Sequence, residues 1–121
     1  MAKILVVEDD DAVRSFVVRA LQNAGYEIDQ ACDGAQGLQT IEDMQAAYDL
    51  VLSDIRMPEM DGIEMAKAAA SRFPGLKIML VTGYADQRER AEDLDKVIID
   101  VMQKPFALAD LWARVGRALA A

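Results

Sequence analysis

The chain has 121 residues, of which 53% are hydrophobic and 28% charged, and its formal net charge is −8. This length predicts a single domain, residues 1–121, with no room for a separate output domain. The absence of histidine and the single cysteine exclude histidine-based catalysis and a disulfide framework, and disfavour zinc, haem and iron–sulfur sites. The acidic balance disfavours nucleic acid as a partner. No apolar run is long enough for a signal-peptide core or a membrane span, so we expect a cytoplasmic protein that does not contact membranes.

Short apolar runs alternate with amphipathic stretches along the whole sequence. We expect strands at 4–7, 26–30, 50–52, 76–81 and 97–103. Between and after them, helices are expected at 11–24, 35–41, 63–72, 86–95 and 108–119. Such alternation predicts an α/β fold, a doubly wound five-stranded parallel sheet with helices on both faces. Right-handed crossovers leave few ways to wind it, and we favour the flavodoxin-like strand order 2-1-3-4-5 over the Rossmann order.

Polar residues follow four of the expected strands. Glu8 and Asp9 come after the first strand, and Asp54 ends the third. Thr82 follows the fourth strand, and Lys104 the fifth. In the order 2-1-3-4-5 the first and third strands are neighbours, so the three carboxylates should converge at the carboxyl edge of the sheet. Carboxylates so placed repel one another, and Mg²⁺, a hard cation with oxygen ligands, is the natural compensating ion.

These residues together suit phosphoryl chemistry. Asp54 is the candidate nucleophile, because a carboxylate can form an aspartyl phosphate. The oxygens of a transferred phosphoryl group need positive or hydrogen-bonding partners, which Mg²⁺, the Lys104 ammonium and the Thr82 hydroxyl would supply. Each residue taken alone also has a structural explanation, as a helix cap, a turn residue or a solvated lysine. Their combination at four strand ends favours a functional site.

Four stretches of the sequence resemble response-regulator receiver domains, the CheY-like family: Val6–Asp10, Asp54–Gly62, Val81–Gly83 and Lys104–Phe106. They occur in the order and at the spacing typical of that family and cover nearly the whole chain. The resemblance implies phosphoryl transfer to Asp54 from a histidine kinase or a histidine phosphotransfer protein. It also implies Asp9 and Asp54 as Mg²⁺ ligands, with Glu8 acting mainly through water. The peptide carbonyl of Arg56 would be a further metal ligand, and the Lys104–Pro105 bond would be cis.

A narrower resemblance lies towards the end of the chain, where residues 82–85 and 97–106 are similar to the CpdR family of stand-alone receivers. That family implies a role in regulated proteolysis, with the ClpXP protease or its substrates as partners. Two features depart from the usual receiver pattern. Val101 stands where many receivers carry a switch aromatic, for which Tyr84 is a candidate substitute, and residues 94–96 replace the usual Gly-Ala turn.

Three rival functions use the same residues differently. A Mg²⁺-dependent phosphatase with an aspartyl intermediate would place a second aspartate where Arg56 stands. A flavodoxin-type flavin module would need a hydroxyl- and glycine-rich loop, whereas residues 8–11 are acidic and would repel its phosphate. A scaffold that is never phosphorylated is disfavoured by the intact acid, hydroxyl and lysine positions. The polar helix expected at 86–95 is interpreted either as the surface that phosphorylation moves or as a solvated face with i,i+4 ion pairs.

Overall fold

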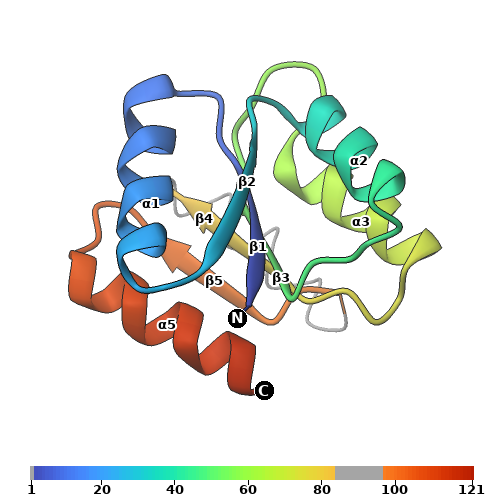
Figure 1. The fold of residues 1–121 in the computed structure, drawn as a ribbon. Helices are drawn as coiled ribbons and strands as arrows, with labels where there is room; N and C mark the ends of the chain where they lie inside the picture. The colour runs from blue at the N-terminus through green and yellow to red at the C-terminus, as the bar shows by residue number, and fades with distance from the viewer. Residues whose placement is uncertain (1, 84–96) are drawn as a thin grey trace.

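The fold is a parallel five-stranded sheet between two layers of helices (Figure 1). The structure is a computed structural model, and it describes residues 2–83 and 97–121. The strands are β1 (Lys3–Val7), β2 (Glu27–Ala31), β3 (Leu50–Asp54), β4 (Ile78–Thr82) and β5 (Asp100–Gln103). The helices are α1 (Asp11–Asn23), α2 (Gly34–Asp43), α3 (Gly62–Arg72) and α5 (Leu108–Ala120). The helix predicted at 86–95 and the side chain of Tyr84 lie outside the described residues.

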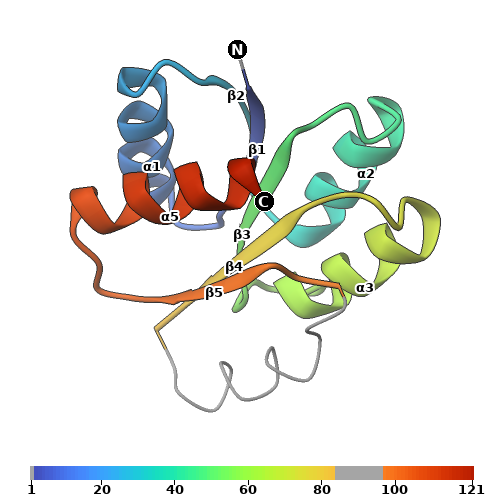
Figure 2. The same cartoon turned by 90° about the horizontal axis from the view of Figure 1, so that it is seen from below.

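The strands are hydrogen-bonded in the order β2-β1-β3-β4-β5. This confirms the flavodoxin-like order and shows that the Rossmann alternative is wrong. Seen from below, α1 and α5 cover one face of the sheet, and α2 and α3 cover the other (Figure 2). None of the described helices is long and apolar enough to cross a bilayer.

Each face of the sheet carries its own hydrophobic core. Alternate residues of β1 point to opposite faces, so Leu5 and Val7 pack in one core while Ile4 and Val6 pack in the other. All four of these side chains are buried. A strand covered on both faces needs apolar residues at its buried positions, which explains the continuous aliphatic run from Ile4 to Val7.

Three helices begin at an aspartate that caps their N-terminus. The side chain of Asp10 accepts hydrogen bonds from the backbone N–H groups at the start of α1, and Asp33 does the same for α2. Asp61 forms a capping box with Glu64 at the start of α3. Such caps satisfy backbone donors that have no partner within the helix. After β1 and β2 the capped helix starts within a few residues of the strand, whereas a longer loop separates β3 from α3.

The last strand is shorter than predicted. The apolar run suggested strand from residue 97, but β5 begins at Asp100. Ile98 is buried and packs in the core, whereas Ile99 is 42% exposed and its N–H already bonds to the carbonyl of Ile78, at 2.8 Å. The apolar residues before β5 thus include one, Ile98, that packs in the core without belonging to the strand.

The loop between β3 and α3 is packed closely enough to require glycine at two positions. A Cβ atom on Gly62 would lie 2.2 Å from the carbonyl oxygen of Asp54. One on Gly34, at the start of α2, would lie 2.2 Å from the carbonyl oxygen of Met60. Within the loop, Glu59 adopts a left-handed backbone conformation with φ of 65°. This close packing holds the backbone that follows Asp54.

Candidate functional site

The strand order brings three carboxylates together at the carboxyl edge of the sheet. One oxygen from each of Glu8, Asp9 and Asp54 lies within 4.8 Å of the others. Glu8 and Asp54 are buried, with 5% and 8% of their surfaces exposed, whereas Asp9 is exposed. The arrangement follows from the pairing of β1 with β3, in which Val7 lies beside Ser53, so that Glu8 and Asp54 follow on neighbouring strands.

Lys104 lies between two of these carboxylates. Its Nζ atom is 3.3 Å from Oε2 of Glu8 and 3.4 Å from Oδ1 of Asp54. The backbone N–H of Lys104 donates to the carbonyl of Thr82 over 2.7 Å, which ties the end of β5 to the end of β4. The Lys104–Pro105 peptide bond is cis, as the family resemblance implied.

The carboxylates and Lys104 form one wall of an open pocket of about 420 Å³. Its lining residues are Glu8, Asp9, Asp10, Val13, Asp54, Arg56, Gly83 and Lys104. Arg56 therefore lies at the pocket, next to the candidate acceptor. Thr82 does not line it: the residue ends β4 with 1% of its surface exposed, and Gly83 contributes to the lining instead.

The site carries more negative charge than its lysine balances. Burial raises the pKa of Glu8 to about 7, and the charge of Asp54 adds to this against the opposing effects of the Asp10 N–H and Lys104. Burial also raises the pKa of Asp54, with a further contribution from Asp9 and an opposing one from Lys104. For Lys104 burial alone would lower the pKa, but the charges of Asp54 and Glu8 outweigh it and raise the pKa. Carboxylates in this state favour a bound cation.

The sequence analysis did not identify two residues that contact the backbone of the site. The Ser53 hydroxyl donates to the carbonyl of Asp54 over 2.9 Å. Nη1 of Arg14 donates to the carbonyl of Glu8, also over 2.9 Å. The position of Arg14 carried a signal, because helical side chains point towards the helix N-terminus and Arg14 lies one turn after the cap residue Asp10.

Comparison with known proteins identifies the class to which this fold and site belong. Residues 4–116 match the response regulator receiver domain family, and the chain belongs to that family. It is thus a CheY-like receiver of two-component signalling, not a turnover enzyme, which excludes the phosphatase alternative. The cluster of Glu8, Asp9 and Asp54 is the acidic set typical of such receivers.

Among individual relatives, the chain is 39% identical to the response regulator receiver protein CpdR of Brucella abortus, covering all of this chain and 99% of that protein. A CheY-like receiver domain protein from Methanospirillum hungatei superposes with a TM-score of 0.90 at 32% identity, covering 99% of this chain and 94% of the other. The response regulator TrrA of Thermotoga maritima, solved in complex with Mg²⁺ and BeF, gives a TM-score of 0.86 at 32% identity, covering 98% and 99% of the two chains.

Proposed function

We propose that this protein is a phosphorylation-dependent switch of a two-component phosphorelay, and that Asp54 accepts the phosphoryl group. A histidine kinase or histidine phosphotransfer protein would be the donor. The observation that carries the proposal is the position of Asp54. Its carboxylate is buried at the edge of an open pocket, 3.4 Å from the Lys104 ammonium and beside two further carboxylates.

The same pocket suits Mg²⁺. Glu8, Asp9 and Asp54 offer hard oxygen ligands within 4.8 Å of one another, and the Lys104 ammonium alone does not balance their charge. In this proposal Asp9, Asp54 and the peptide carbonyl of Arg56 hold the ion, with Glu8 acting mainly through water. When bound, Mg²⁺ would neutralise the carboxylates and the charge on the phosphoryl oxygens. The Mg²⁺–BeF complex of TrrA, a relative of nearly equal length, supports this assignment.

The transfer itself exchanges one bond to phosphorus for another. An oxygen of the Asp54 carboxylate forms a P–O bond while the P–N bond of the donor phosphohistidine breaks. The electron pair of the broken bond stays on the imidazole nitrogen, which takes up a proton from solvent. The Lys104 ammonium contacts one phosphoryl oxygen, and the Thr82 hydroxyl turns towards another. These contacts supply positive charge and hydrogen bonds to the oxygens that carry the developing negative charge.

Phosphorylation would change which proteins the receiver binds. Thr82 ends β4 and is buried beside the site, so its movement towards a phosphoryl group would pull on the segment that follows it. This is a local charge change that biases a two-state element. In this proposal the receiver is cytoplasmic and controls proteolysis through ClpXP or its substrates, which its 39% identity to CpdR over the full length of both chains supports.

The test is the intact mass of the protein after incubation with acetyl phosphate, with and without Mg²⁺. We expect a single phosphoryl adduct that requires Mg²⁺ and is absent from Asp54→Ala. Asp49→Ala is the matched control, because Asp49 lies at the opposite edge of the sheet and should leave the adduct unchanged. If neither acetyl phosphate nor a phosphorylated histidine donor gives an adduct, the protein is a scaffold rather than a phosphoacceptor.

A further inference from the structure

We propose that Arg14 is a positioning residue for the Mg²⁺ site. Its guanidinium holds the segment between β1 and α1 in the conformation that directs Glu8 and Asp9 towards Asp54. This inference rests on the proposed function, since it concerns the same metal site. No ligand contact is assigned to Arg14 itself, which acts through the backbone that carries the ligands.

The guanidinium of Arg14 joins three parts of the structure. Nη1 donates to the carbonyl of Glu8 over 2.9 Å, and Nε donates to the side-chain oxygen of Gln30 on β2 over 3.2 Å. Nη2 pairs with Asp11 over 2.5 Å. The Arg14 side chain is only 17% exposed, and its bond to the Glu8 carbonyl is partly buried, whereas its contacts with Gln30 and Asp11 lie at the surface. A planar guanidinium presents its donors in fixed directions, which lets a single side chain hold all three partners in one geometry.

The bond to the Glu8 carbonyl adds to two other hydrogen bonds of the peptide groups around Asp9. The N–H of Glu8 donates to the carbonyl of Ala31, and the N–H of Asp10 donates to the Glu8 side chain, each over 3.1 Å. Arg14 fixes the peptide group that lies between these two. Asp9 is exposed, so its orientation depends on this backbone rather than on side-chain packing. Without Arg14, the carbonyl just before Asp9 would lose a charge-assisted hydrogen bond.

Arg14 is itself well placed to hold the segment. Its own N–H bonds to the carbonyl of Asp10 over 2.8 Å, and Asp10 caps α1. The side chain therefore extends from the first turn of a rigid helix back over the preceding loop. Arg14 thereby fixes the residues that follow β1 relative to α1 and β2.

Charge and positioning predict opposite effects on metal binding. If Arg14 acted only as a positive charge near the pocket, removing it would strengthen Mg²⁺ binding, because like charges repel. If Arg14 acts by positioning, removing it weakens Mg²⁺ binding. Groups that orient metal ligands typically change metal affinity by about 10- to 100-fold when they are mutated. The sign of the change therefore separates the two roles.

The experiment is calorimetric titration of the metal-free protein with Mg²⁺. Arg14→Met keeps the aliphatic stem, and we expect it to raise the Kd about tenfold. Arg14→Lys keeps the charge but not the three directed bonds, and should give an intermediate Kd. Arg19→Met is the matched control, because Arg19 lies on the same helix and is exposed; its Kd should stay within about twofold of wild type. Amide hydrogen exchange without metal gives a second readout, and Arg14→Met should speed exchange at Asp9 and Asp10.

The outcomes separate this inference from the proposed function. If wild type binds Mg²⁺ and Arg14→Met binds it equally well or more tightly, the positioning role is wrong while the Mg²⁺ site stands. If wild type does not bind Mg²⁺, the proposed metal site fails and this inference fails with it. Should Arg14→Met not fold, Arg14→Lys decides the question, because an unchanged Kd in that variant would show that the directed bonds of the guanidinium do not position the metal ligands.

Discussion

The two edges of the sheet use charged residues in opposite ways. At the carboxyl edge, Glu8, Asp9 and Asp54 lie together and Lys104 pairs with Glu8 and Asp54. Burial and the charge of Asp54 raise the pKa of Glu8 to about 7. At the amino edge, the side chain of Lys3 lies 3.6 Å from Asp29, and its backbone N–H donates to Asp49 over 2.8 Å. The charges at the amino edge are paired within the protein, whereas those at the carboxyl edge favour a ligand.

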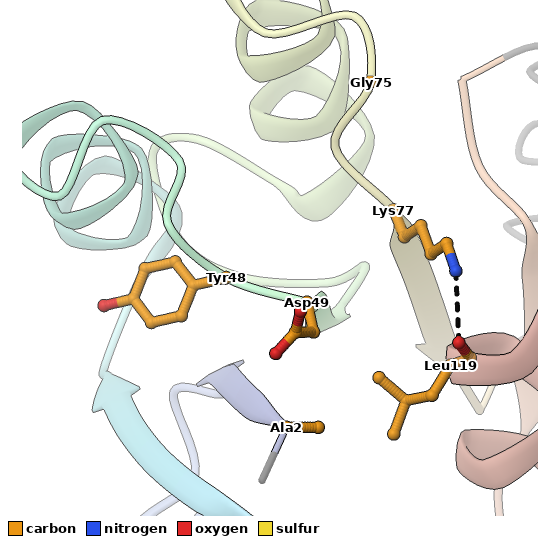
Figure 3. A pocket seen from close by; sticks show the side chains of 6 residues that line it. All are labelled: Ala2, Tyr48, Asp49, Gly75, Lys77 and Leu119. Carbon is orange, nitrogen blue, oxygen red and sulfur yellow. Dashed lines mark hydrogen bonds between the residues drawn. The ribbon is translucent and has the colours of Figure 1, made fainter.

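Pocket volume does not distinguish these two edges. The amino edge has a pocket of about 480 Å³, and the pocket at the carboxyl edge has about 420 Å³. Figure 3 shows the amino-edge pocket, in which Lys77 reaches across to α5 and donates to the carbonyl of Leu119 over 3.2 Å. Asp49 in the same pocket accepts the hydrogen bond from Lys3. Its charged groups thus already have partners, so the balance of charge, not the size of the pocket, indicates the functional edge.

The largest expected effect comes from a methyl group added at Gly62, at the carboxyl edge, with the same change at Gly75, at the amino edge, as its control. Gly62→Ala should destabilise the protein by about 2–3 kcal/mol, because its Cβ would lie 2.2 Å from the Asp54 carbonyl and the backbone would have to move. Gly75→Ala, at the amino-edge pocket, meets nothing within 4 Å and should change stability by less than about 0.5 kcal/mol. Urea denaturation of both variants measures the difference. Equal stabilities would show that the β3–α3 loop tolerates displacement.

A smaller effect is expected from breaking the pairing at the amino edge. The hydroxyl of Tyr48, a residue only 7% exposed, donates to Asp29 over 2.7 Å. Burial, together with the hydrogen bond and charge of Asp29, raises the pKa of Tyr48 above its usual range. Tyr48→Phe should cost about 1–2 kcal/mol of unfolding free energy, because a hydrogen bond to a charged acceptor is lost.

The same variant tests whether the two edges are independent. Tyr48→Phe should leave the Mg²⁺ Kd within about twofold of wild type, because distant sites without shared partners act additively. Calorimetric titration beside the denaturation experiment measures this. A large change in Kd would mean that the network at the amino edge also supports the metal site.

The sequence predicted the two edges unequally well. The strand order and the convergence of carboxylates follow from the β–α alternation and from acidic residues directly after two strands. The amino-edge network was not predicted, because Lys3, Asp29 and Tyr48 come from separate elements whose contacts depend on strand register. Arg14 was overlooked although its place one turn after the Asp10 cap was informative, because a bond to a backbone carbonyl has no residue-type signature. Local patterns thus indicate elements and strand ends, while long-range pairs require the fold.

The smallest expected effect has the opposite sign and tests the contrast between the edges most directly. Asp54→Asn keeps the size of the side chain but removes one buried negative charge from the cluster. Lys104 retains Glu8 as a partner at 3.3 Å, so the variant does not leave the ammonium unpaired. Because the pKa of Asp54 is raised, the folded state disfavours its charge. In metal-free buffer Asp54→Asn should therefore stabilise the protein by up to about 1 kcal/mol.

Adding Mg²⁺ should reverse that ranking. A ligand that binds only the folded state stabilises it by mass action, so wild type gains stability with Mg²⁺ while Asp54→Asn, which lacks one ligand charge, gains much less. Thermal unfolding of both proteins in chelator and in saturating Mg²⁺ measures the crossover. If Asp54→Asn is instead the less stable protein in chelator, the attraction between Asp54 and Lys104 outweighs the repulsion among the carboxylates. The carboxyl edge would then be as well balanced as the amino edge, and its charge would no longer be an argument for a bound cation.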